Sequence, residues 1–397
     1  MKKVIFGTAL ASMALLSACS SDNELANVET AANNAIGFHV VGNKAETRAT
    51  PITPGNLKTT DFNVFAYKKN DNGTDGDIFM GDKENDNYLY GVRIKYETET
   101  NKWVYKDPNE LRYWPTTALN FYAVNPGSTN FFSWNFTNEK KQITYTCSDE
   151  YAKDNEGKYS NHENIDAMYA VAKNKTQIDN NGIVKFNFKH ILSQVVFQAK
   201  TQYANMQVEI KALSIHNFYG GGIFTIPKEE REPSQTDWAP TTVTYHSTNG
   251  LTAVMDQSIT VDKTDKAAMI STKGPMLLVP QQLKEWDLSG NIDAANTAKQ
   301  SYLKITCKIK QSGAYLFGSD SDYGVLYVPF GADWQPGKRY IYTLIFGGGY
   351  NVQGQAILKP INFDSEVEAW NENVWLITSC VMMPMNRMFM PSIRRIL

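Results

Sequence analysis

The sequence predicts an all-β protein made of two antiparallel β-sandwich domains in tandem. Apolar and polar residues alternate with a period of two along many short segments, as they do in strands with one buried face. Clusters of Asn, Asp, Gly, Ser and Pro separate these segments about every dozen residues, a spacing typical of sandwiches. The length of 397 residues also exceeds one ordinary core and favours two domains.

Individual elements follow from the same two signals. Residues 303–310 alternate apolar side chains with Lys and Thr, which predicts a strand with Cys307 as a small buried residue. Residues 70–73 and 179–182 are the strongest turn signals, because Asn, Asp and Gly tolerate tight turns. We expect the seam between the domains within residues 182–200.

Composition excludes several classes of function. A net charge of -2 and an isoelectric point near 6.3 leave no basic surface of the kind that binds nucleic acid. Beyond Cys19, three widely spaced cysteines (Cys147, Cys307 and Cys380) form neither a disulfide framework nor a metal motif. A single bridge from Cys147 to one of the other two stays open.

The N-terminus has the features of an export signal. Lys2 and Lys3 precede an apolar run from residue 4 to residue 16, which is shorter than the about 20 residues that a membrane span needs. Residues 16–19, Leu-Ser-Ala-Cys, resemble the lipobox at which lipoprotein signal peptidase cuts before a diacylated cysteine. We therefore expect residues 1–18 to be removed and Cys19 to carry lipid, the alternative being a chance cysteine near an ordinary cleavage site.

No catalytic, cofactor or metal-binding residues can be assigned from the sequence. The five histidines form no metal-binding pair, and His190, among Phe188, Ile191 and Leu192, is expected to be a structural, hydrogen-bonded residue. Residues 331–338 superficially resemble a phosphate loop but precede an expected strand rather than a helix. Residues 71–77 lack the closing glutamate of a calcium loop, which favours a solvated loop.

Five groups of residues, in order along the chain, resemble the fimbrillin family, the subunits of type V pili with their accessory tip and anchor proteins. They are residues 36–40 with 46–49, 113–115 with 119–126, 188–193, 275–281 and 334–340. The resemblance covers nearly the whole chain behind the lipobox. It implies transthyretin-like, Greek-key sandwiches and a non-enzymatic, structural or adhesive role in a cell-surface pilus.

The resemblance also implies a division of the chain and a processing step. The segments are a signal peptide (1–18), a lipidated propeptide with the first strand (19–48), an N-terminal domain (49–188), a C-terminal domain (189–372) and a tail (373–397). In the family, an arginine-specific protease cuts after the first strand, here between Arg48 and Ala49. The cut would remove the strand with Ile36, Phe38, Val40 and Val41, three or four of which are expected to be fully buried. The alternative is that residues 47–49 form an ordinary polar loop.

The tail departs from the usual family ending and leaves alternatives open. Residues 374–383 are extended in character and apolar, so we expect a donor strand that includes Val374, Leu376, Ile377 and Val381. The same segment could instead fold onto its own chain or be an aberrant terminus. The expected partners are other pilus subunits, a surface ligand and, through the precursor's lipid, the outer membrane.

Two rival functions remain at this stage. One is a monomeric glycan-binding lipoprotein of the outer surface, in which exposed aromatic side chains stack on sugar rings. Its candidate residues are Trp103, Trp114, Trp238 and Trp286, although a buried core position is the more common role for tryptophan. The other rival is an enzyme, which would require a convergent set of titratable groups in a cleft.

Overall fold

Strands dominate the fold. The computed structural model describes residues 34–41, 57–81, 84–85, 88–89, 91–127, 132–137, 140–147, 166–241, 245–246, 250–253, 255, 257–272, 274–347, 354 and 362–369. Within these ranges the helical elements are α2 (Ile292–Thr297) and the 3-10 turns η2 (Pro108–Glu110), η4 (Asp179–Gly182) and η5 (Gln235–Asp237). No helix in this part of the chain has the length and apolar character needed to span a membrane. The all-β prediction is confirmed.

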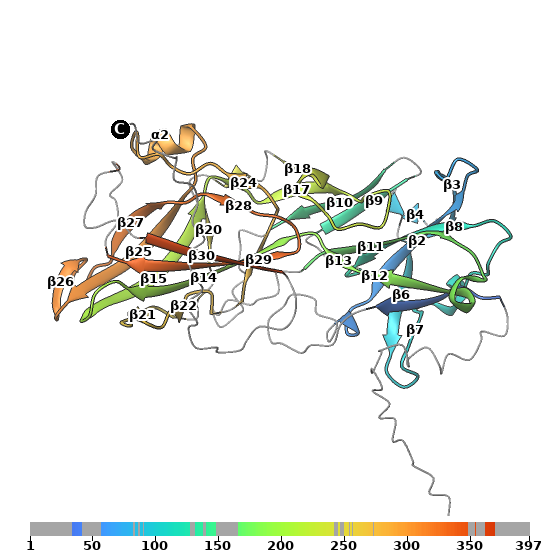
Figure 1. Ribbon diagram of the computed structural model, residues 1–397, viewed down its shortest axis with the longest axis horizontal. Coiled ribbons are helices and arrows are strands. Elements are labelled where there is room, and N and C mark those ends of the chain that lie inside the picture. Colours follow the sequence, from blue (N-terminus) through green and yellow to red (C-terminus); the bar gives the residue numbers. More distant parts are fainter. Residues whose placement is uncertain are drawn as a thin grey trace, which may run out of the picture.

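A nine-stranded sheet occupies one end of the long axis (Figure 1). Its order is β12 (Ile183–Asn187), β1 (Gly37–Val41), β7 (Lys102–Tyr105), β6 (Val92–Glu97), β2 (Phe62–Lys69), β8 (Leu119–Asn125), β11 (Met168–Lys175) and β13 (Lys189–His190), with β3 (Asp75–Met80) also paired to β2. The sheet curls, because side chains from β12 at one end and β11 near the other belong to one core cluster.

The central strands of this sheet are buried on both faces. In β2, Phe62 and Val64 face the cluster inside the curl, whereas Phe65 and Tyr67 face a second, larger cluster. β8 and β11 divide their side chains in the same way. Strands buried on both sides carry continuous apolar runs instead of alternation, which explains why the sequence of β8 is apolar almost throughout.

A four-stranded sheet lies against the second face and joins the two halves of the chain. It contains β18 (Trp238–Pro240), β17 (Gly221–Thr225), β10 (Lys141–Thr146) and β9 (Phe132–Phe136) in that order. Its strands therefore come from both sides of the boundary expected between residues 188 and 189. That boundary stays a prediction, although one hydrophobic cluster runs across it.

The other end of the molecule consists of two sheets that share a core. One contains β22 (Ala268–Met269), β14 (Ser193–Thr201), β29 (Lys338–Phe346) and β30 (Asn362–Ala369), with β23 (Met276–Leu278) on β14. The other contains β20 (Leu251–Thr252), β15 (Met206–His216), β25 (Tyr302–Gln311) and β26 (Ala314–Phe317), with β21 (Ile259–Val261) on β15 and β27 (Gly324–Pro329) on β25. Both sheets contribute side chains to the same cluster, as a sandwich requires.

Three two-stranded pairs complete the described fold: β16 (Phe218–Tyr219) with β19 (Tyr245–His246), β24 (Gln282–Leu283) with β28 (Ala332–Asp333), and β4 (Glu84–Asn85) with β5 (Tyr88–Leu89).

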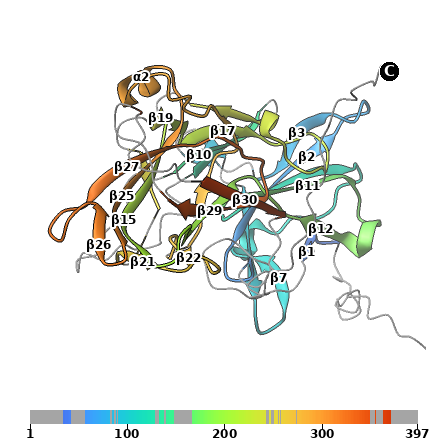
Figure 2. The same cartoon turned by 60° about the vertical axis from the view of Figure 1, so that its left-hand side comes forward.

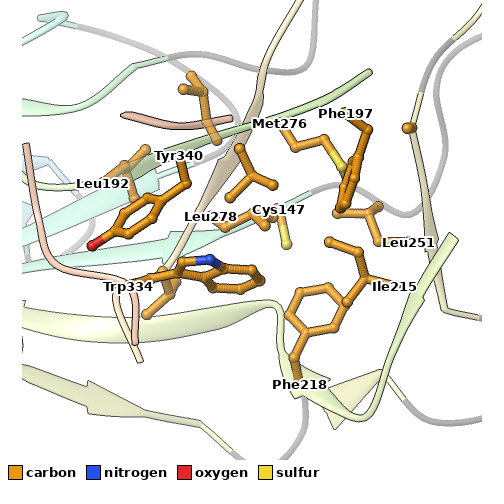
Figure 3. Packing of buried hydrophobic residues seen from close by; sticks show 14 of the residues in the cluster. Cys147, Leu192, Phe197, Ile215, Phe218, Leu251, Met276, Leu278, Trp334 and Tyr340 are labelled. Atoms are coloured by element: carbon orange, nitrogen blue, oxygen red, sulfur yellow. The ribbon is translucent and has the colours of Figure 1, made fainter. Parts of the chain in front are cut away.

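The shared core explains the state of two cysteines. Figure 3 shows Cys147 among Leu278, Met276 and Ile215 in this cluster. Its thiol donates a hydrogen bond to the carbonyl of Gly220 at 2.7 Å. Cys147 and Cys307 are both buried and free, which excludes the bridge between them that the sequence left open. Burial raises the pKa of the Cys307 thiol to about 12, so it remains protonated.

Two strand pairings are parallel, unlike the antiparallel arrangement that the sequence predicts. β1 runs parallel to β12, and β14 runs parallel to β29 over eight register pairs. In each case the partners are far apart in the chain, and a parallel pair needs such a long connection. The predicted strand in residues 303–310 is confirmed as β25, with Ile305 and Cys307 fully buried.

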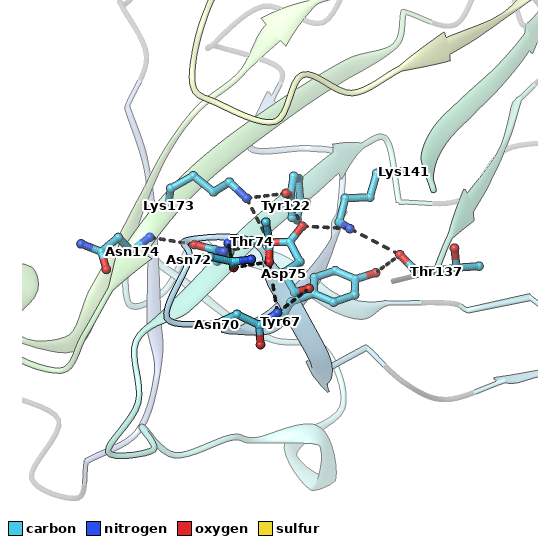
Figure 4. Close-up of polar contacts among 11 residues, drawn as sticks. Tyr67, Asn70, Asn72, Thr74, Asp75, Tyr122, Thr137, Lys141, Lys173 and Asn174 are labelled. Carbon is cyan, nitrogen blue, oxygen red and sulfur yellow. Dashed lines mark hydrogen bonds and ion pairs between the residues drawn. The ribbon is translucent and has the colours of Figure 1, made fainter. Parts of the chain in front are cut away.

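A partly buried carboxylate fastens the β3 hairpin to three other strands (Figure 4). Asp75 accepts hydrogen bonds from the Tyr122 hydroxyl at 2.6 Å and the Asn120 amide at 2.8 Å. Its two oxygens also form ion pairs with Lys141 Nζ of β10 at 2.9 Å and Lys173 Nζ of β11 at 3.0 Å. Burial alone would raise the Asp75 pKa, but the bonds from Tyr122 and the two lysines outweigh it and lower the pKa to about 2.

We predict that Asp75→Asn destabilises the chain by about 3 kcal/mol, because Lys141 is left buried without its counter-charge. The measurement is urea unfolding of the full chain, with Asp77→Asn as a control at an exposed position of the same strand. Asp75→Asn combined with Lys141→Met should recover much of the loss, since that pair removes the uncompensated charge. Equal stability of Asp75→Asn and Asp77→Asn would contradict the assignment.

The same carboxylate predicts a dependence of stability on pH. The Asp75 pKa is lower in the folded chain than its ordinary value of 3.8, so the folded state binds the proton less well than the unfolded state. Its stabilisation is therefore complete above about pH 4 and is lost as the pH falls toward about 2. Unfolding measured across that range should show a smaller acid-induced loss for Asp75→Asn than for the native chain.

Candidate functional site

β1 lies between β12 and β7, next to one end of the nine-stranded sheet. Figure 2 shows it beside β12. Five consecutive register pairs, from Gly37 with Ile183 to Val41 with Asn187, join it in parallel to β12. On its other side it meets β7 in a single antiparallel pair, Phe38 with Trp103. In the sheet order β1 is also the only described neighbour of β12, so it closes the curl.

Backbone hydrogen bonds fix the residues where β1 begins. The Ile36 amide donates to the Arg112 carbonyl at 2.9 Å, and the Tyr105 hydroxyl donates to the Ile36 carbonyl at 3.1 Å. Two residues before Ile36, the carbonyl of Asn34 accepts a hydrogen bond from the Trp114 amide at 2.9 Å. The Asn34 side chain donates a hydrogen bond to the Trp114 carbonyl at 3.3 Å. The beginning of the strand is therefore held by side-chain and loop contacts as well as by a ladder.

The turn that precedes β12 supports the same end of β1. Asn180 and Asn181 adopt the left-handed conformation at φ 48° and 56°, which Asn tolerates better than most residues. Gly182 follows at φ 80°, and a Cβ there would lie 3.0 Å from Trp114 Nε1. The Trp114 indole donates a hydrogen bond to the Gly182 carbonyl at 3.0 Å. A turn predicted from Asn and Gly thus positions both β12 and Trp114.

Two side chains fill an apolar slot, by which we mean the space that Ile36, immediately before β1, and Phe38 of β1 occupy between β12 and β7. Ile36 is 1% exposed and Phe38 is 6% exposed. The Phe38 ring stacks on Phe186 at 6.0 Å between centroids and meets Phe121 edge-on at 6.5 Å. Tyr105 closes the slot toward the surface, with its ring centroid 5.6 Å from that of Phe38.

Burial along β1 differs from the sequence expectation. Only Ile36 and Phe38 are buried, Val40 is partly buried, and Val41 is 50% exposed. The expectation of three or four fully buried side chains was wrong because successive side chains of a strand point to opposite faces, so Val41 lies on the face opposite that of Phe38 and Val40. Ile36 and Phe38, two residues apart, therefore provide most of the side-chain anchoring of β1.

The slot is suited to holding a strand rather than to chemistry. Its lining is aromatic and aliphatic, and burial raises the pKa of the Tyr105 hydroxyl, which stays neutral. Across the described part of the chain, no group of three or more His, Cys, Asp or Glu side chains could hold a metal ion. What the slot offers is apolar surface and two strand edges.

The structure places some residues singled out in the sequence and not others. Cys19, Arg48, Ala49, Val374, Leu376, Ile377 and Val381 lie outside the described residues. Arg48 falls in the segment between the end of β1 at Val41 and Leu57. His190 is a structural residue as predicted, with its Nδ1 2.7 Å from Asp166 Oδ2.

The four tryptophans considered for sugar stacking are all buried. Trp103, Trp114, Trp238 and Trp286 are between 2% and 8% exposed. Three of them lie in the two large core clusters, and Trp286 packs in a small third cluster with Ala295 and Tyr302. None presents an open ring face, so the glycan-binding interpretation loses its candidate residues.

Sequence reasoning missed the residues that support β1 from outside. Tyr105 and Arg112 received no role because their partner Ile36 lies about 70 positions away in the chain. The signals that were present were the Trp114-Pro115 string and the Asn-Gly turn of residues 179–182. Each signal was interpreted locally, although both act on the same strand end.

Comparisons with known proteins agree on the family of this chain. The family model of fimbrillin-like proteins matches residues 47–370. The fimbrium subunit Fim1C of Phocaeicola vulgatus is 27% identical over 192 residues, which are 44% of this chain and 46% of that protein. The chain thus spans about half the length of this curated relative.

A solved structure supports the fold. A fimbrial protein from Bacteroides vulgatus has a TM-score of 0.55 and 18% sequence identity with this chain, over 85% of this chain and 100% of that one. At this identity the likeness shows the architecture alone. The family match covers most of the chain and confirms the resemblance found in its sequence strings. The chain belongs to the fimbrillin-like family.

Proposed function

We propose that the chain is a non-enzymatic structural or adhesive subunit of a bacterial cell-surface pilus. It is exported as a lipoprotein through Cys19 to the outer membrane, cut between Arg48 and Ala49, and then assembled into the extracellular pilus by strand exchange. The observation that carries the proposal is β1, a separate strand ahead of Arg48 that fills an apolar slot in the sheet.

The burial of β1 gives the cut a physical consequence. Full burial of an aliphatic or aromatic side chain contributes about 1.5–3 kcal/mol, so Ile36 and Phe38 together contribute about 3–6 kcal/mol. Val40 adds a smaller amount. This sum is comparable with the stability of a whole domain, about 5–15 kcal/mol. A precursor would therefore be held together by β1 until the connection through residues 42–56 is cut.

Loss of β1 would create the surface that assembly requires. β12 would lose its only described ladder partner, and β7 would lose its contact at Trp103. Unpaired strand edges beside apolar side chains are a template for a strand from another chain. The expected partners are accordingly other pilus subunits, and the donor strand is assigned to the tail that contains Val374, Leu376, Ile377 and Val381.

The glycan-binding lipoprotein is the alternative function, and one observation weakens it. The aromatic residues that would stack on sugars are in the core. An arginine-specific protease separates the two proposals, because the pilus subunit needs the cut and the glycan-binding monomer does not.

We predict that the purified precursor is cut between Arg48 and Ala49 by an arginine-specific protease and then forms ladders of polymer. Mass spectrometry of the new N-terminus and gel electrophoresis without boiling measure the two steps. Arg48→Gln should stay uncut at this position and monomeric, while Arg231→Gln, at an exposed arginine outside the slot, serves as a control. An uncut native monomer with measurable glycan affinity would support the alternative instead.

We predict that Phe38→Ala speeds the release of the cut β1 fragment by about a hundredfold or more. Truncation of a buried Phe costs about 3–5 kcal/mol, and each 1.4 kcal/mol changes an equilibrium about tenfold. Release can be followed by size-exclusion chromatography and mass spectrometry after the cut. Val41→Ala, at a half-exposed position of the same strand, should change the release little. Equal release from both variants would show that the slot does not hold β1.

We predict that deletion of residues 374–397 leaves the cut at Arg48 intact but abolishes polymer formation. The reason is that the donor strand is removed while the slot remains. Mixing the deleted chain with native chain should cap growing polymers, which sedimentation would show as shorter species. Normal polymers from the deleted chain alone would refute the assignment of the donor to the tail.

A further inference from the structure

The proposed cut at Arg48 requires an arginine-specific protease to leave the other arginines of the folded chain intact. The described residues contain four arginines, which are Arg93, Arg112, Arg231 and Arg339. Arg93 and Arg339 lie in β6 and β29, where neighbouring strands hold the backbone. Of these four, Arg231 alone is exposed, and it lies in the loop between β17 and η5. Arg231 is therefore the position at which a second cut would be expected.

The guanidinium of Arg231 is held by Asp237. Its Nη1 and Nη2 atoms donate hydrogen bonds to Oδ2 and Oδ1 of Asp237 at 2.8 and 2.5 Å, a bidentate geometry that fixes the side chain. The Asp237 side chain is 12% exposed, and its Oδ2 also accepts from the Ser234 amide at 2.8 Å. Burial would raise the pKa of Asp237, but the bonds from Arg231 and Ser234 outweigh it and lower the pKa. The carboxylate therefore stays charged at neutral pH.

The carbonyl group next to the bond that such a cut would break is held as well. The Tyr169 hydroxyl of β11 donates a hydrogen bond to the Arg231 carbonyl at 2.8 Å. Tyr169 is 1% exposed and its ring packs 5.2 Å from that of Phe224, so the hydroxyl has a fixed position. Burial raises the pKa of Tyr169, which keeps the hydroxyl protonated as a donor. The next residue, Glu232, forms an ion pair with Lys189 of β13.

These contacts occupy the two groups of Arg231 that a protease must bind. An arginine-specific protease takes the guanidinium into a pocket and the carbonyl oxygen into an oxyanion hole. In the folded chain, Asp237 already binds the first group and Tyr169 the second. Cutting then requires a local opening that breaks both contacts, and its rate follows the fraction of chains in the open state.

We propose that Asp237 and Tyr169 protect Arg231 from the arginine-specific protease, so that the folded body stays intact while Arg48 is cut. The inference rests on the proposed function and adds the residues that decide which exposed arginine the protease uses. Protection comes from two contacts of one residue, and the surrounding loop remains accessible.

The first experiment treats full-length chains with an arginine-specific protease and follows the new N-termini by mass spectrometry. The native chain should gain a terminus at Ala49 and remain intact after Arg231. Tyr169→Phe combined with Asp237→Asn should be cut after Arg231 at least tenfold faster than the native chain. The reason is that a single amide oxygen cannot replace the bidentate ion pair and the carbonyl has lost its donor.

Two controls establish that the effect is local. Tyr315→Phe combined with Asp320→Asn removes a hydroxyl–carboxylate hydrogen bond at an exposed site and should leave the chain intact after Arg231. In the variant of Tyr169 and Asp237, the strands that contain Arg93 and Arg339 should remain uncut. Cuts at Arg93 and Arg339 as fast as the cut after Arg231 would show unfolding of the body and overturn the local assignment.

Lys228→Arg tests the loop without changing either contact. Lys228 is exposed in the same loop and, like Arg231, is followed by a glutamate. This variant should be cut after position 228 and stay intact after Arg231. A variant that is cut at neither position would show that the whole loop excludes the protease, and this result would overturn the inference.

The native chain separates the inference from the proposed function. Equally fast cuts after Arg48 and Arg231 overturn the inference and leave the proposed function standing. A native chain that stays intact after Arg48 overturns the proposed function, whereas the comparison of the variants at Arg231 still decides the inference.

Discussion

The pairing of β1 with β12 is the contact on which the nine-stranded sheet depends. In the described sheet order β12 has no ladder partner except β1, and the cluster inside the curl includes Phe186 of β12 packed against Phe38. The strand is also the one whose burial rests on so few side chains. Under the proposed function, this strand is the element that is exchanged while the other strands of the sheet stay in place.

The opposite face of that sheet shows why the exchange can stay local. β2, β8 and β11 are buried on both sides, and the ion pairs of Asp75 with Lys173 of β11 and Lys141 of β10 tie their outer face to β10. The large cluster then continues into the two sheets at the other end of the molecule. β2, β8 and β11 therefore also pack against a second core on their opposite face, which holds them in place if β1 changes. The slot is supported by a rigid wall, which is the condition for accepting a new strand in a defined register.

Much of the fold could be predicted from the sequence because its signals are local. The alternation of residues 303–310 predicts β25, and the Asn-Gly string of residues 179–182 predicts the turn that carries Gly182. The parallel pairing of β1 could not be predicted, since a strand's sequence does not state which distant partner it meets. The same holds for Asp75, whose partner Lys173 is 98 positions away. Its place in an Asn- and Gly-rich segment indicated only a solvated loop.

The candidate site shows the limit of sequence-based prediction more clearly, because the sequence identified the strand but not the contacts that hold it in the sheet. The string of residues 36–40 marked β1 through a family resemblance, and burial then proved narrower than its apolar residues suggested, with Val41 half exposed. That difference matters physically. For the proposed release after a cut, two buried anchors leave less apolar burial to overcome than four would. The ring-lined Phe38 position then discriminates among incoming strands, since an aliphatic residue there would leave a void and a polar one would lack partners.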